Sequence, residues 1–267
     1  MRRTALLVIT LSAIGAKAQE RPDPPPFQDF TFRRVAPPAS DGEPRIRVQI
    51  GPETDVVAIP DAAPEESLGA AALPFDWFWA TVSRDLDVDP AERFRRAMQA
   101  LTDGAAAGQG AAPSLDDMRR ITETYRADLL GLTVGTAVSP ALAAAVIHAE
   151  SSGKPEAESS AGAVGLMQLM PETASRFEVQ DRTDPTQNIR GGVAFLDELM
   201  GVFDRDPILV LAAYNAGETA VRENAGVPPY PETLGYVPRV LAAWNVARAL
   251  CVTPPDLVTD GCVFIGG

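Results

Sequence analysis

Four prolines in the second half of the chain stand where helices commonly begin. Ser139-Pro140 and Asp184-Pro185 each place a capping side chain before a proline, and Met170-Pro171 and Pro207 provide two further starts. Proline suits the first helical position, because its φ is already helical and its missing N–H is not needed there. Since no run of alternating residues is long enough for a large sheet, the chain is predicted to be mainly α.

Hydrophobic spacing gives the extent of the expected helices. After Pro185, Ile189, Val193, Leu196, Met200 and Phe203 recur at intervals of four and three, which predicts one long helix with a single apolar face. The helix that begins at Pro140 should run to about Ser151 and stop at Gly153. Short helices are expected from Met170-Pro171 and at 207–213 and 218–223, with longer ones at 90–101, 115–130 and 236–250.

The N-terminus has the pattern of a secretory signal at residues 1–18. Arg2 and Arg3 precede a short apolar run, and Ala16-Lys17-Ala18 offers small residues for cleavage after Ala18. That run is too short to span a bilayer, and no later segment approaches the necessary length. We therefore expect an exported protein without a membrane span, periplasmic in a cell with an outer membrane. The alternative is that these residues form a buried N-terminal helix.

Composition divides the rest of the chain into four parts. Residues 19–72 are rich in proline and are predicted to be a linker or arm, with a small hairpin possible at 45–59. Residues 73–133 open with the aromatic cluster at 74–79, for which core packing is favoured over a contact surface. The helices of this extension should dock on the following domain, residues 134–250, and 251–267 form a tail.

Charge and cysteine content exclude several classes of function. The chain has 23 basic and 36 acidic side chains and a net charge of -13, so nucleic-acid binding is disfavoured. The only cysteines are Cys251 and Cys262, which in an exported protein favour a disulfide, with two free thiols as the alternative. With one histidine and no clustered ligand spacing, neither a metal site nor a cofactor is expected.

Four motifs follow one another within the predicted domain. They are Glu150-Ser151, GAVGLMQLMP at 162–171, AYNAG at 213–217 and Tyr236-Val237. In this order and spacing they resemble the catalytic domain of the family 1 soluble lytic transglycosylases, the SLT domain, over about residues 134–250. The resemblance implies a lysozyme-like, goose-type-like fold and binding of peptidoglycan glycan strands. It also implies non-hydrolytic cleavage of the β-1,4 bond between N-acetylmuramic acid and N-acetylglucosamine, which leaves 1,6-anhydromuramoyl ends.

Glu150 is the candidate catalytic residue. The end of its helix carries partial negative charge, and Val146 and Ile147 share its face, so both effects should raise the pKa of this carboxyl. A raised pKa suits a group that must donate a proton near neutral pH. The resemblance implies that Glu150 acts first as acid and then as base. From spacing alone a second carboxylate stays open, and the candidates are Glu156, Glu158, Glu172 and Asp184.

The other candidate residues have binding or shaping roles. The resemblance implies that Ser159, or its neighbour Ser160, holds the muramic N-acetyl group or the side chain of Glu150. It also implies that Tyr214 and Tyr236 contact the glycan. Gln168 offers donors and acceptors for sugar groups, while Met167 and Met170 are divided between sugar contact and core filling. The predicted substrate-binding set is Ser159, Gln168, Met170, Tyr214 and Tyr236, and the predicted loop-shaping set is Gly162, Gly165, Asn215 and Gly217.

Two positions depart from the family pattern. Lys154-Pro155 and Phe195 differ from the usual residues, which should leave the reaction unaffected but could alter peptide or glycan preference.

Two other functions stay open. The first alternative function is a hydrolytic muramidase on the same fold. The second is a non-catalytic scaffold that binds the wall. Local wall opening for a secretion system or flagellum is one interpretation, with an envelope partner bound through the arm or tail.

Overall fold

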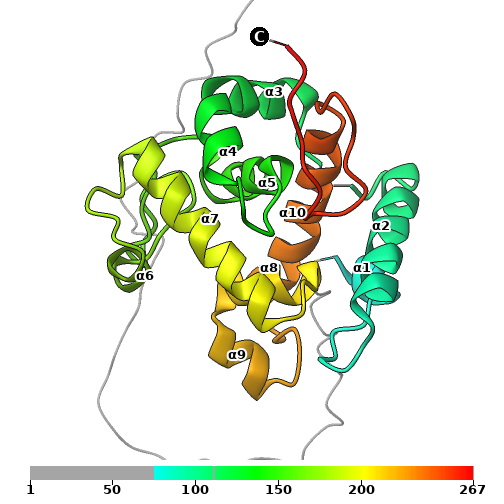
Figure 1. Cartoon of the computed structure of the whole chain (residues 1–267). Coiled ribbons are helices and arrows are strands. Elements are labelled where there is room, and N and C mark those ends of the chain that lie inside the picture. The colour runs from blue at the N-terminus through cyan, green and yellow to red at the C-terminus, as the bar shows by residue number, and fades with distance from the viewer. Residues whose placement is uncertain (1–74, 111, 267) are drawn as a thin grey trace, which may run out of the picture. The chain divides into compact units, whose positions relative to one another are not determined.

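The computed structural model describes residues 75–110 and 112–266. The expected signal, the Pro-rich arm and the hairpin at 45–59 lie outside the described residues. Within them the chain forms ten helices and only isolated β-bridges (Figure 1). The helices are α1 Asp76–Trp79, α2 Pro90–Ala106, α3 Leu115–Thr124, α4 Arg126–Leu132, α5 Pro140–Ser151, α6 Pro171–Arg176, α7 Pro185–Val202, α8 Pro207–Ala216, α9 Glu218–Glu223 and α10 Pro231–Arg248.

The mainly α prediction is confirmed, as are the four proline starts. Ser139 Oγ accepts a hydrogen bond from the Leu142 N–H at 3.0 Å, and Asp184 Oδ1 accepts one from the Gln187 N–H at 2.8 Å. These side chains satisfy backbone donors that the first turn of a helix leaves free. The cap and the proline together therefore fix where α5 and α7 begin.

Four helix predictions were wrong in extent. Helix α2 ends at Ala106 rather than at 101, and α8 ends at Ala216 rather than at 213. The single helix expected at 115–130 is divided into α3 and α4 at Tyr125, whose φ and ψ are -107° and 19°. The Tyr125 hydroxyl donates to the Gly153 carbonyl at 3.0 Å, a long-range contact that local spacing does not reveal. Helix α10 begins at Pro231 rather than at 236, because Pro231 occupies the first helical position.

Helix α5 lies at the centre of the helical domain. Its residues from Ala141 to Ile147 are fully buried on every side, and it packs most extensively against α10, with further contacts to α3 and α4 (Figure 1). A helix that is apolar all round must be covered all round. Only its last turn reaches partial exposure, and that turn carries Glu150.

The extension before residue 133 is part of this core, and core packing of its aromatic cluster is confirmed. Phe78 is fully buried, and the Trp79 Nε1–H donates to the Leu234 carbonyl at 2.8 Å. Within α10 that carbonyl would normally accept from residue 238, but Pro238 has no N–H to donate. Trp79 thus supplies the donor that the proline removes, and it ties α1 to α10.

A buried ion pair also joins the extension to the domain. Arg93 of α2 and Asp206 before α8 are 0% and 1% exposed, and Arg93 Nε lies 3.1 Å from Asp206 Oδ2 without hydrogen-bond geometry. Arg93 also donates to the Asp85 carbonyl at 2.6 Å, while Asp206 Oδ1 accepts from the N–H groups of Ile208 and Leu209. Burial lowers the pKa of Arg93 and raises that of Asp206, so desolvation opposes the charge on both groups.

The C-terminal tail is held against the helices by the predicted disulfide, which the structure confirms. Cys251 and Cys262 are bonded, their Cα atoms lie 5.4 Å apart, and Phe264 is buried beside them. Arg126 of α4 donates to the Phe264 carbonyl. The described residues of the tail and the extension belong with the helical domain to one compact unit.

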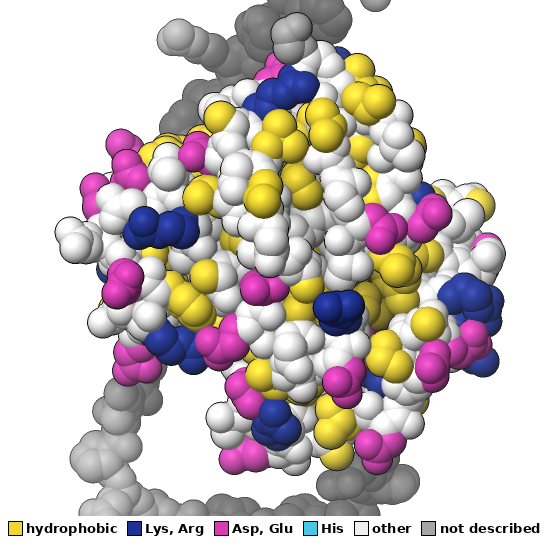
Figure 2. All heavy atoms as spheres, viewed as in Figure 1, with side chains coloured by type: hydrophobic (Ala, Val, Ile, Leu, Met, Phe, Trp, Pro, Cys, Tyr) yellow, Lys and Arg dark blue, Asp and Glu magenta, His cyan; other side chains and the backbone are white. Residues whose placement is uncertain are grey.

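Figure 2 shows acidic and basic side chains interspersed over one face of this unit. None of the helices at 75–110 and 112–266 combines the length and apolar character that crossing a membrane requires.

Candidate active site

Glu150 lies in the last turn of α5 and is hydrogen-bonded to α10. The Tyr236 hydroxyl donates to Glu150 Oε1 at 2.7 Å. Helix α5 ends at Ser151; the next residue, Ser152, has a positive φ of 53°, and the chain then turns into the connection that leads to α6. Glu150 and Tyr236 are separated by 86 positions in the sequence, so only the packing of α5 on α10 brings them together.

Burial sets the protonation of Glu150. It raises the pKa of this carboxyl from 4.5 to about 7, and it prevails over the Tyr236 hydrogen bond, which lowers the pKa. The charge of Glu232 contributes to the rise of the pKa of Glu150, and that of Arg239 opposes it; the value of about 7 includes both. The carboxyl can therefore hold its proton near neutral pH, and the tyrosine hydroxyl can stabilise the carboxylate once the proton has left.

Asn188 of α7 organises the connection between Glu150 and α6. It is fully buried; its Oδ1 accepts from the Met167 N–H at 2.7 Å, and its Nδ2 donates to the carbonyls of Val164 and Arg182 at 3.0 and 2.8 Å. Gly165 lies against it, with φ of 91°, and a Cβ there would stand 2.1 Å from Asn188 Nδ2. Gly165 is thus required for internal packing of the loop.

Ser151, Ser159 and Gln168 also bond to the loop backbone. Ser151 Oγ donates to the Leu166 carbonyl at 2.8 Å, and Ser159 Oγ accepts from the Ala163 N–H at 3.0 Å. Gln168 Nε2 donates to the carbonyls of Ala157 and Gly165, at 3.0 and 2.9 Å. Both amide hydrogens of Gln168 are thereby engaged, which leaves its carbonyl oxygen as the group available to a ligand.

The structure separates the two methionines. Met167 is fully buried and belongs to the core, whereas Met170 is 42% exposed immediately before α6. Gly162 has a φ of 88°, and a Cβ there would meet no atom within 4 Å, so the glycine allows the turn; its carbonyl accepts a hydrogen bond from Arg182 at 2.7 Å.

Tyr214 reaches the same loop from α8. Its hydroxyl donates to the Met167 carbonyl at 2.8 Å, and burial together with the charge of Glu150 raises the pKa of its hydroxyl well above 10. The neighbouring Asn215 accepts a hydrogen bond from Thr233 at 2.7 Å, which joins α8 to α10. Gly217, with φ of 91°, ends α8 and precedes α9.

Sequence reasoning missed Asn188 and the acidic neighbour of Glu150. Asn188 stands beside Ile189 at the start of a buried apolar helix face, and a polar residue there was an available signal. The carboxylate whose charge acts on Glu150 is Glu232 of α10, distant in sequence. Of the four candidates weighed earlier, Glu156, Glu158 and Glu172 are exposed, while Asp184 caps α7.

Comparison with known proteins identifies the domain. Residues 133–229 match the model of the transglycosylase SLT domain, so the chain carries this domain, and the SLT domain expected from its motifs is confirmed. The "transglycosylase" of Enterobacteria phage PRD1 is 42% identical over 104 residues, which cover 37% of this chain and 39% of that protein. The soluble lytic murein transglycosylase of Escherichia coli K12 is 34% identical over 150 residues, covering 48% and 23%.

Among solved structures, the 70-kDa soluble lytic transglycosylase of Escherichia coli is 26% identical, with a TM-score of 0.47 over 66% of this chain and 31% of that one. The chain thus matches only a minor part of the length of each of these relatives. Across residues 75–110 and 112–266, the structure contains no group of three or more His, Cys, Asp or Glu side chains placed to hold a metal ion.

Proposed function

We propose that this protein is a peptidoglycan lytic transglycosylase with Glu150 as its catalytic acid and base. The observation that carries the proposal is the state of Glu150. It is a carboxyl with a pKa of about 7, hydrogen-bonded by Tyr236 and located within an SLT domain. A pKa close to the working pH lets one group donate and then accept a proton.

The proposed reaction needs no water. Glu150 gives its proton to the oxygen between C1 of N-acetylmuramic acid and C4 of N-acetylglucosamine, and the C1–O bond breaks. The C6 hydroxyl of the same muramic residue then attacks C1 and forms the 1,6-anhydro ring. Glu150, now a carboxylate stabilised by Tyr236, takes the proton of that hydroxyl and returns to its starting state.

A single carboxylate is sufficient for this scheme because the nucleophile is tethered to the reacting sugar. An intramolecular hydroxyl has a high effective concentration and requires no second residue to hold and activate water. Glu232 is exposed at the start of α10, and we assign it the role of raising the pKa of Glu150 rather than that of a nucleophile.

The proposed substrate contacts follow the sequence predictions with altered roles. Met170, the Gln168 carbonyl oxygen and the partly exposed ring of Tyr214 contact the glycan, whereas Tyr236 is only 2% exposed and acts through its hydrogen bond to Glu150. Ser159 acts through the 159–163 turn that it closes. The substrate is the cell wall outside the cytoplasm, and local wall opening for an envelope machine is a narrower form of the same proposal.

The test is the product released from purified sacculi by the full chain and by Glu150→Gln. General acid catalysis contributes about 10² to 10⁴ in rate, so release should fall at least that far while binding to sacculi persists. Mass spectrometry of the wild-type products decides the chemistry, because anhydro ends lack the water that hydrolysis adds. Hydrolytic ends would indicate a muramidase, and binding without release would indicate a scaffold. Near-wild-type release by Glu150→Gln would remove this residue from the mechanism.

A further inference from the structure

A row of aromatic contacts joins Tyr214 of α8 to Phe195 of α7 and to Phe177, which follows α6. The Phe195 ring centroid lies 5.1 Å from that of Tyr214, and the Phe177 centroid lies 6.0 Å beyond that of Phe195. All three rings are partly exposed. Phe195 has no hydroxyl, so this part of the row offers its faces and edges rather than hydrogen bonds.

Arg176, the last residue of α6, covers the far end of this row. Its Cζ lies 4.7 Å from the Phe177 centroid and 5.4 Å from that of Phe195, and α6 lies beside α7 (Figure 1). The aromatic faces hold the planar guanidinium in a defined orientation through cation–π attraction. The Phe195 ring therefore lies 5.1 Å from the Tyr214 ring and 5.4 Å from the guanidinium, so Arg176 stands one ring away from Tyr214.

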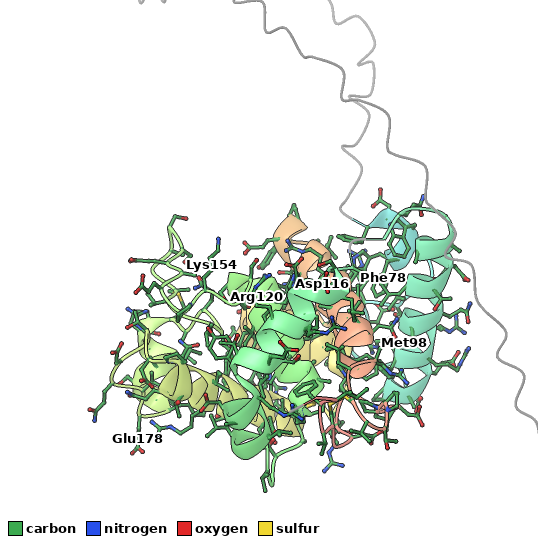
Figure 3. The ribbon with its side chains drawn as sticks, turned by 90° about the horizontal axis from the view of Figure 1, so that it is seen from above. Phe78, Met98, Asp116, Arg120, Lys154 and Glu178 are labelled. Atoms are coloured by element: carbon green, nitrogen blue, oxygen red, sulfur yellow. A yellow bond between two sulfur atoms is a disulfide. The ribbon has the colours of Figure 1, made fainter. Side chains whose placement is uncertain are left out.

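The guanidinium is only partly occupied. One nitrogen of Arg176, Nη2, donates to Glu198 Oε1 at 2.8 Å. The side chains of Arg176 and Glu198 are 51% and 42% exposed. Within the described part of the chain, its other N–H groups have no acceptor. Glu178, which follows Phe177, points outwards at the edge of the molecule (Figure 3). A group arriving from solvent can reach the free edge of the guanidinium.

We infer that Arg176, held over Phe177 and Phe195, binds a carboxylate of the peptide stem of peptidoglycan. The inference rests on the proposed function, in which the Tyr214 ring contacts the glycan strand. Each muramic residue carries a stem with free carboxylates, and arginine binds a carboxylate through two parallel N–H donors. The protein is strongly acidic, so an anionic stem needs a local cation of this kind. Arg176 is thus a specificity-determining residue that favours peptide-bearing strands.

The experiment compares cleavage of peptide-bearing glycan strands with strands stripped of their stems by an amidase. For each variant of the full chain, the quantity measured is the ratio of kcat/KM on the two substrates. Arg176→Gln should lower this ratio roughly 5- to 10-fold, as expected for loss of one exposed charge-assisted contact. Glu198→Gln should maintain or raise the ratio, because it removes the carboxylate that competes for Arg176.

Arg222→Gln is the matched control. Arg222 pairs with Glu218 at 2.7 Å, has a side chain 54% exposed and lies over the Phe203 ring at 5.6 Å, so it reproduces the local chemistry of Arg176. Arg222 and Asp206 line the same pocket. Asp206 precedes the first residue of α8, and Tyr214 lies near the last, so this pocket is at the other end of α8 from Tyr214. Its substitution should leave the substrate ratio unchanged.

The outcomes separate this inference from the proposed function. An unchanged ratio in Arg176→Gln, or an equal fall in Arg176→Gln and Glu198→Gln, overturns the stem contact and indicates that the ion pair is only structural. Absence of anhydro products from the wild-type chain overturns the proposed function instead. Equilibrium binding of the two strand preparations to Glu150→Gln, with and without Arg176→Gln, then measures the stem contact without turnover.

Discussion

At the scale of single residues, Glu150 and Tyr236 have opposite effects on one proton. Burial favours the protonated carboxyl, and the tyrosine hydroxyl favours the carboxylate. Because burial prevails, the folded protein holds a proton that the unfolded chain releases at lower pH. Such a group lowers the free energy of unfolding at any pH above its pKa in the unfolded chain. At those pH values the unfolded chain is ionised, whereas the folded protein must either keep the proton or bury the charge.

Glu150→Gln should therefore stabilise the fold in a pH-dependent way. The folded pKa is about 7 and the ordinary value is 4.5, so stability of the wild type falls as pH rises between these values and is constant above them. Glutamine does not titrate, and the variant should gain about 1–3 kcal/mol at pH 8 relative to pH 4, after allowance for partial exposure. Urea unfolding at both pH values measures the gain. Glu156→Gln, at an exposed site in the same connection, should show none.

Tyr236→Phe should shift the pH dependence of activity to higher values. Loss of the hydroxyl removes the hydrogen bond that lowers the pKa of Glu150, so the alkaline limb of kcat/KM should move upwards. The rate near neutral pH should fall about 10- to 100-fold, since a hydrogen bond to a charged group is worth roughly 1.5–3 kcal/mol. A pH–rate profile checks both effects, with Tyr230→Phe as the exposed control. A limb that moves to lower pH would contradict the assigned role of Tyr236.

At the scale of helices, the buried pair of Arg93 and Asp206 joins α2 to the start of α8. Asp206 has two functions there, because it caps α8 and also opposes the charge of Arg93. Helix α8 carries Tyr214 at its other end, so the position of this helix matters for the site. Removing one partner leaves a buried charge without compensation.

Arg93→Met should accordingly destabilise the fold by about 3–5 kcal/mol. Adding Asp206→Asn should recover part of the loss, because asparagine removes the unpaired charge and can still cap α8. Chemical denaturation of the two single variants and the double variant measures the coupling. Additive losses in the double variant would show that the two side chains act independently.

Helices also show what the sequence could and could not predict. The starts of α5 and α7 follow from a capping side chain and a proline, both local features, and the structure confirms them. The helix breaks at Tyr125, whose hydroxyl is bonded to the carbonyl of Gly153 in a distant connection, and local spacing does not reveal this contact. Glu150 stood out through its motif, whereas its neighbour Glu232 is brought near only by the packing of α5 on α10.

At the scale of the whole molecule, the disulfide closes the tail onto the end of α10. The Cys251–Cys262 loop spans 11 positions, and the candidate site involves none of its residues. Replacing both cysteines with alanine should cost about 3 kcal/mol of unfolding free energy, mainly through greater freedom of the unfolded chain. Thermal unfolding with and without reductant tests this. Activity below the melting transition should be retained, and its loss would show that the tail supports the site.

Pro238 makes the helix that bears Tyr236 dependent on an indole outside the matched SLT region, because the Trp79 N–H satisfies the carbonyl that the proline leaves free. Natural recombination that transferred only residues 133–229 into another chain would leave out the donor Trp79, the acceptor Leu234 and Tyr236 itself. Selection on such exchanges should favour transfer of the preceding aromatic segment together with the domain. The heritable module is therefore larger than the region that family comparison recognises, and Trp79 and Pro238 should change together over evolutionary time.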